Sequence, residues 1–148
     1  MKQADIQRLQ HICEYCIQIR NTIHRFGESF EIFDTDPDYQ QSISFSILQI
    51  GELVGNLSEE YRISTTKSIQ WGPIKGMRNM VAHGYGKMNR SIIWETAVND
   101  IPVLQQFCDE QITLYSAVHQ DSAISIQQVA KQMILDSQLS QEQDAPEL

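Results

Sequence analysis

The sequence predicts an all-α protein: a helical bundle of four to five helices with an appended C-terminal helix or tail. In several long segments, apolar residues recur at alternating spacings of three and four, which places them on one face of a helix. No segment alternates apolar and polar residues over more than a few positions. The length predicts a single bundle, which we place at residues 1–118, followed by an extension at residues 119–148.

The first helix is expected at residues 5–28. Asp5 is a suitable cap for its first turn, and Gly27 marks its end. The inward-facing stripe consists of Leu9, Ile12, Cys16, Ile19, Ile23 and Phe26.

The second helix is expected at residues 38–57, because Asp36 can cap it and Pro37 suits the first helical position. Gly51 and Gly55 lie four residues apart on this helix. They would let another backbone come close on one side. The apolar stripe is Ile43, Ile47, Ile50, Val54 and Leu57.

The polar, poorly periodic stretch at residues 58–70 predicts a loop with one extra helical turn. A short helix should begin near Trp71 and stop near His83, because Gly84 and Gly86 follow. Its inward residues are Ile74, Met77 and Val81.

The last main helix is expected to open at Asn89, a good N-cap. Pro102 lies inside it and should kink it by removing one backbone donor. A weaker amphipathic pattern predicts an appended helix at residues 122–139, and we expect residues 140–148 to fray.

Positive charge is concentrated in one segment of an acidic chain. Residues 61–94 contain six Lys or Arg and no Asp or Glu, whereas the whole chain has 11 basic and 19 acidic residues and a net charge of −8. This balance argues against a general nucleic-acid coat protein, which is broadly basic. It is compatible with an enzyme that touches a few phosphates through a local patch.

We find no apolar run long enough to cross a bilayer and no signal peptide, so we expect a cytoplasmic protein without membrane association. The three cysteines predict no disulfide framework. Cys13 and Cys16 have zinc-like spacing without a second pair, and core packing explains them better than a metal site. We therefore expect neither a metal nor another cofactor.

Residues 78–85 place a permanent cation, an imidazole and a phenol within eight positions of this basic segment. Arg78 can hold two phosphate oxygens, and His83 can exchange a proton near neutral pH. Asn79 can orient the imidazole or bind the phosphate, Tyr85 offers a hydroxyl and a ring, and Lys75 can support substrate binding. RNA supplies its own nucleophile, the 2′-hydroxyl, so proton transfer and charge stabilisation are sufficient for cleavage.

One helix supplies only one imidazole, whereas strand cleavage benefits from a base and an acid at once. We therefore hypothesise a twofold homodimer that faces two copies of Arg78 and His83 across a cleft.

The chain resembles the HepT-type HEPN family, the ribonuclease toxins of toxin–antitoxin pairs. The residues that carry this resemblance extend from about residue 5 to residue 115. They are the motif Arg78-Asn79-x-x-x-His83-x-Tyr85 and the surrounding Asp5-x-x-Arg8-Leu9, Ile50-Gly51-Glu52, Asn56-Leu57-Ser58, Trp71, Gly76-Met77 and Ile93-Trp94.

The resemblance implies an all-α bundle that dimerises around the motif. It also implies a metal-independent endoribonuclease, with Arg78 and His83 catalytic and tRNA as the expected target. The implied partner is a minimal nucleotidyltransferase antitoxin that adds AMP to Tyr85. Such an adduct would place a bulky anion beside Arg78 and block the site.

Two other interpretations remain open. A non-catalytic subunit could use the same cleft to hold a nucleotide or to regulate a nucleotidyltransferase. A purely structural bundle could use His83 as a buried cap of a helix end, but this leaves the charge segregation unexplained. For Trp71 and Trp94, packing is favoured over base stacking, and His11, His24 and His119 are expected to be isolated surface residues.

Overall fold

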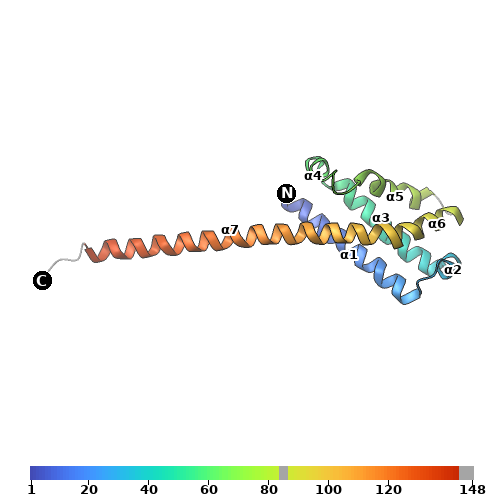
Figure 1. Cartoon of the computed structure of the whole chain (residues 1–148), viewed down its shortest axis with the longest axis horizontal. Helices are drawn as coiled ribbons and strands as arrows, with labels where there is room; N and C mark the ends of the chain where they lie inside the picture. Colours follow the sequence, from blue (N-terminus) through green and yellow to red (C-terminus); the bar gives the residue numbers. More distant parts are fainter. Residues whose placement is uncertain (84–86, 144–148) are drawn as a thin grey trace. The chain divides into compact units, whose positions relative to one another are not determined.

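The computed structural model describes residues 1–83 and 87–143, without the side chains of His83, Lys87, Met88 and Gln143. In these residues all regular structure is helical, which confirms the predicted all-α class (Figure 1). The elements are α1 (Gln3–Phe26), α2 (Phe30–Thr35), α3 (Pro37–Asn56), α4 (Glu59–Ser64), α5 (Trp71–His83), α6 (Lys87–Glu95), the π-helical η1 (Thr96–Asp100) and α7 (Ile101–Gln143).

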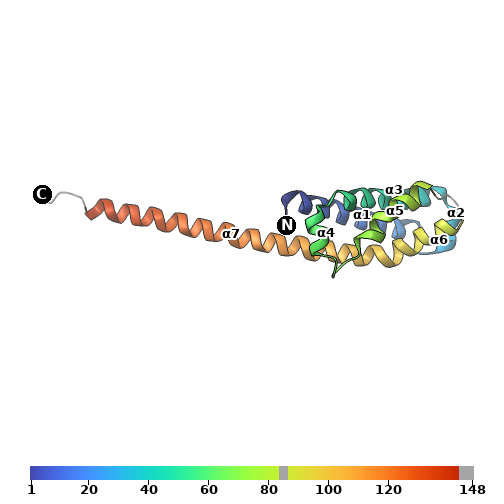
Figure 2. The ribbon, with the colours of Figure 1, turned by 90° about the horizontal axis from the view of Figure 1, so that it is seen from above.

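The chain divides into two compact units, Met1–Ile112 and Thr113–Leu148. The predicted domain limit after residue 118 stays a prediction. In the first unit α3 is the central helix, with α1 and α5 packed against it (Figures 1 and 2). The predicted stripes form the core: the fully buried side chains include Leu9, Ile12, Cys16, Ile43, Ile47, Ile50, Val54 and Leu104.

Three of the four predicted signals at the ends of α1 and α3 are confirmed. Gly27 ends α1 with a φ of 121°, which a residue with a side chain rarely adopts. Asp36 caps α3, because its carboxylate accepts from the backbone N–H of Asp38 at 3.0 Å and of Tyr39 at 3.3 Å. Pro37 occupies the first turn, as predicted.

The prediction that Asp5 caps its own helix is wrong. Helix α1 begins two residues earlier, at Gln3, without a side-chain cap. Asp5 is fully buried and accepts from the backbone N–H of Ser58 at 2.8 Å and from its hydroxyl at 2.6 Å. A tertiary partner has replaced the local one, and the carboxylate joins α1 to the start of α4.

The C-terminal helices also differ from the prediction. Asn89 is not a cap, because α6 already begins at Lys87. Before Pro102 the helix widens into the π-helical turn η1, which accommodates a residue without a backbone donor. Among the residues that the structure describes there is no separate appended helix, because α7 continues to Gln143. Residues 103–143 contain neither glycine nor proline that could interrupt it.

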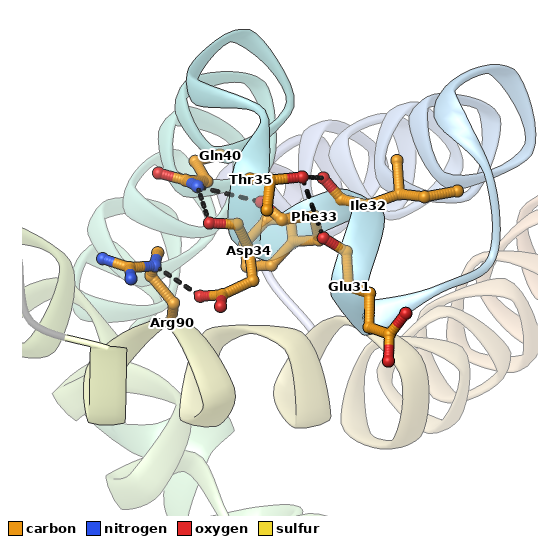
Figure 3. Close-up of polar contacts among 7 residues, drawn as sticks. All are labelled: Glu31, Ile32, Phe33, Asp34, Thr35, Gln40 and Arg90. Carbon is orange, nitrogen blue, oxygen red and sulfur yellow. Dashed lines mark hydrogen bonds and ion pairs between the residues drawn. The ribbon is translucent and has the colours of Figure 1, made fainter.

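Helix α2, which the sequence did not predict, is joined to α6 and α3 by side chains (Figure 3). Arg90 on α6 donates through Nε to the carboxylate of Asp34 at 2.7 Å. Gln40 on α3 donates to the carbonyl oxygens of Phe33 at 2.9 Å and Asp34 at 3.0 Å. Below these contacts the buried Phe33 ring packs against Trp94, at 5.4 Å between ring centroids.

In the second unit, the apolar side chains of the described residues are exposed, including Val118, Ile126, Val129, Met133 and Leu139. None of the helices that the structure describes carries an apolar stretch of the length that a bilayer requires.

Candidate active site

Helix α5 has a buried face that fixes its orientation. Trp71, Ile74 and Met77 are all buried, at spacings of three. The indole N–H of Trp71 donates to the Thr65 hydroxyl at 2.8 Å, and its ring makes an edge contact with Phe107. Trp71 therefore has the packing role that the sequence favoured. The residues between these buried positions face solvent.

The exposed face of α5 borders a groove of about 470 Å³ between α3 and α5. Lys75, Arg78 and Asn79 all line it, so three of the predicted site residues are brought together. A Cβ built at Gly72 or Gly76 meets nothing within 4 Å, so both glycines leave space open. The α3 side of the groove consists of Gly51, Glu52, Gly55 and Asn56.

The predicted close approach of another backbone to α3 occurs at Gly51. A Cβ at this position would lie 3.1 Å from the Cβ of Arg78 and 3.4 Å from its backbone nitrogen. Such contacts are tighter than most side chains tolerate, so Gly51 lets α5 come close at the residue of interest. At Gly55 the nearest atom is the Cε of Lys75, at 3.7 Å, which is an ordinary contact.

Glu52 is a site residue whose role the sequence did not reveal. Its Oε1 lies 2.5 Å from Nε of Arg78, and the two side chains are 43% and 56% exposed. Arg78, which lies in the acid-free segment, thus forms an ion pair with a carboxylate from a different helix, α3. The glycine pair of α3 was a signal that could have drawn attention to Glu52, because it marks the side of α3 that another helix approaches.

His83 and Tyr85 can be placed only in part. His83 is the last residue of α5, and the sequence predicted that the helix would stop near it. The imidazole of His83 and the whole of Tyr85 lie outside the described residues. The roles of His83 and Tyr85 therefore stay predictions, whereas the structure describes the side chains of Lys75, Arg78 and Asn79.

The cysteines have the structural role that the sequence favoured. Cys13, Cys16 and Cys108 are buried and free. Burial raises the pKa of both the Cys13 and the Cys16 thiol to about 12, and the neighbouring Asp109 adds to the effect. Cys13 donates its proton to the Asp109 carboxylate at 3.0 Å. The described residues contain no cluster of three His, Cys, Asp or Glu side chains suited to a metal.

Comparison with known proteins adds a family to this geometry. Residues 12–111 match the family described as "HepT-like: Ribonuclease HepT-like". The chain belongs to this family. The matched segment runs from within α1 to the first part of α7 and includes the groove and the Arg78 motif.

Two curated relatives belong with this result. "Putative RNase TTE0752" of Caldanaerobacter subterraneus subsp. tengcongensis is 38% identical over 66% of this chain and 85% of its own length. "Putative RNase MJ0127" of Methanocaldococcus jannaschii is 31% identical over 50% of this chain and 60% of its own length. No solved structure matches at the same level of significance.

Proposed function

We propose that this HepT-like protein is a metal-independent endoribonuclease that cleaves RNA with Arg78 and His83. The observation that carries the proposal is the groove beside α5. There Lys75, Arg78 and Asn79 are exposed together on the helix that ends at His83. The family match and the printed names of the two relatives support the same activity.

In the proposed reaction, the 2′-hydroxyl oxygen of one nucleotide attacks the adjacent phosphorus. A bond from this oxygen to phosphorus forms, and the bond to the 5′-oxygen of the next nucleotide breaks. One group takes the 2′-hydroxyl proton, and another donates a proton to the leaving oxygen. The products are a 2′,3′-cyclic phosphate and a 5′-hydroxyl. Arg78 stabilises the charge that gathers on the non-bridging oxygens.

A homodimer completes the proposed site, since one α5 supplies one imidazole and the reaction uses two proton-transfer groups. Two copies of His83 facing one cleft can act as base and acid. The two copies of Arg78, with Asn79 and Lys75 beside each, hold the strand between them.

The finer proposal is that the protein is the toxin of a toxin–antitoxin pair with tRNA as its target. Its partner would be a minimal nucleotidyltransferase that transfers AMP from ATP to the Tyr85 hydroxyl and releases pyrophosphate. The motif spacing supports this step, because Tyr85 follows the end of α5 by two residues. The attached phosphate would compete with RNA for Arg78.

The test is to incubate purified protein with total tRNA in EDTA, beside Arg78→Ala and His83→Ala variants. We expect only the wild type to cleave, leaving cyclic-phosphate ends that mass spectrometry identifies. For the modification, AMP transfer by the partner should silence the wild type and leave Tyr85→Phe active. RNA binding without cleavage by the wild type and by the Arg78→Ala and His83→Ala variants would refute the endoribonuclease.

That last outcome would support a second function, a non-catalytic subunit that binds a nucleotide or regulates a nucleotidyltransferase. The ion pair with Glu52 is the observation that favours it, because a carboxylate already offsets the charge of Arg78.

A further inference from the structure

The carboxylate of Glu52 approaches Arg78 at a particular atom. Its Oε1 lies 2.5 Å from Nε, the guanidinium nitrogen next to the aliphatic part of the side chain. Among the described residues, Glu52 is the one partner of the Arg78 side chain. The two terminal nitrogens carry four of the five N–H donors of the guanidinium and can hold a phosphate in a planar fork. Glu52 therefore contacts Arg78 without occupying that fork.

Helix α3 fixes Arg78 twice, through consecutive residues. Gly51 sets the position of the Arg78 backbone, because a Cβ there would lie 3.1 Å from the Cβ of Arg78. Glu52 then sets the position of the guanidinium at the other end of the same side chain. An arginine side chain loses much rotamer freedom when it is held. A tether at both ends means that this cost is met before RNA binds.

We infer that Glu52 is a positioning residue for RNA cleavage, which holds the Arg78 guanidinium at the groove wall with its fork directed to the phosphate. This inference rests on the proposed endoribonuclease activity. Glu52 acts through Arg78 and does not itself contact the substrate. Its negative charge also opposes RNA, so the site gives up some affinity in exchange for a fixed cation.

This role predicts that the rate and the affinity change in opposite senses when Glu52 is neutralised. In Glu52→Gln and Glu52→Ala the guanidinium is mobile, and we expect the single-turnover cleavage rate to fall about tenfold or more. The same change removes one negative charge beside the strand. RNA should then bind more tightly at low salt, with a slope of log Kd against log salt steeper by about 0.7.

The measurement uses single-turnover cleavage of an RNA oligonucleotide and the Kd of the same oligonucleotide with 2′-O-methyl groups, which cannot be cleaved. Asp34→Asn is the matched control, because it neutralises the carboxylate of the Arg90 pair, and neither residue of that pair lines the groove. It should change neither the rate nor the Kd per folded molecule. Glu52 is nearly half exposed, so thermal unfolding of its variants should stay close to the wild type.

A wild-type rate in both Glu52 variants would overturn the inference. So would a fall in rate accompanied by weaker binding, since that pattern indicates general damage to the site. Nuclear magnetic resonance of the Nε–H of Arg78 in the RNA-free protein separates this result from a failure of the proposed function. The resonance is assigned by its loss in Arg78→Lys. The Nε–H proton of Arg78 should exchange slowly with water in the wild type and faster in Glu52→Gln. If the wild type does not cleave RNA, the endoribonuclease fails, and this signal still shows whether Glu52 orders Arg78.

Discussion

Two arginines of the acid-free segment at residues 61–94 each pair with a carboxylate from another helix, Arg78 with Glu52 and Arg90 with Asp34. The Arg90 pair joins α6 to α2, and its side chains are only 28% and 18% exposed (Figure 3). The Arg78 pair lies on the groove wall and is about twice as exposed. Because water and salt screen exposed charges, we expect the first pair to stabilise the fold and the second to contribute little stability.

Positive charges that are close together in the sequence therefore need not form one patch in space, as Arg78 and Arg90 show. The fold uses Arg90 to hold α2, a helix that lies far from the motif in the sequence. Arg78 stays in reach of a ligand, with Lys75 and Asn79 beside it. The surroundings of each cation, and not its place in the segment, decide whether it can bind a phosphate.

The largest expected effects separate the two arginines. Arg78→Ala should lower the single-turnover RNA cleavage rate by about 10²–10³-fold, the loss typical of removing one transition-state donor. Its melting temperature should remain near that of the wild type, because the pair is exposed. Arg90→Ala should cleave normally per folded molecule. It should lose about 1.5–3 kcal/mol of stability, since Asp34 loses a charged hydrogen bond.

Urea unfolding and single-turnover kinetics on both variants measure this difference. The comparison fails if Arg90→Ala also loses the cleavage rate at full folding, or if Arg78→Ala unfolds as readily as Arg90→Ala.

The next largest effect is expected from Gly51→Ala, which moves the Arg78 backbone. Gly51→Ala adds a methyl group 3.1 Å from the Cβ of Arg78, so α5 must shift. Overpacking of this kind costs about 1–3 kcal/mol, which outweighs a gain of at most about 1 kcal/mol in helix propensity. We also expect slower RNA cleavage, because the cation moves away from its position.

Gly55→Ala is the stability control on the same helix, since its new methyl group meets only Lys75, at 3.7 Å. Thermal unfolding of both variants tests the contrast. If Gly51→Ala is as stable as Gly55→Ala, α5 does not depend on the close approach at Gly51.

Much of this architecture could be predicted from the sequence. The end of α1, the start of α3 and the start of α5 followed from apolar periodicity, from Gly27 and from the Asp36-Pro37 cap. These are local signals, and local physics decides them. The clustering of Lys75, Arg78 and Asn79 is also consistent with the sequence, because Lys75 lies three residues before Arg78 and four before Asn79, which are the spacings of one helix face.

Several of the errors concern contacts between residues distant in the sequence. Asp5 had the chemistry of a local cap, but it binds Ser58, 53 residues away. Helix α2 is a single short helix held by Arg90 and Gln40, and its own six residues carry too little pattern to predict it. Glu52 was part of the family resemblance, yet its contact with Arg78 depends on how α3 and α5 cross.

The smallest effect concerns the aromatic cluster beneath the Arg90 pair, at high pH. Tyr39 packs edge-on against Phe33 and Trp94 and donates its hydroxyl proton to the Gly27 carbonyl at 3.0 Å. Burial, with a smaller contribution from Glu28, raises the pKa of Tyr39 from 10.0 to about 12. The folded protein therefore keeps this proton to higher pH than the unfolded chain does. The stability that Tyr39 contributes is complete below pH 10 and is lost as pH rises from 10 to about 12.

Tyr39→Phe removes this titration together with one hydrogen bond. We expect a constant loss of stability at neutral pH and a shallower decline than in the wild type between pH 10 and 12. Urea unfolding across this range measures both curves. Parallel curves would show that the proton of Tyr39 is not retained on folding. The aromatic rings would then stabilise the region around Arg90 by packing alone. The groove, in contrast, depends on the close approach at Gly51 and on the exposed carboxylate of Glu52.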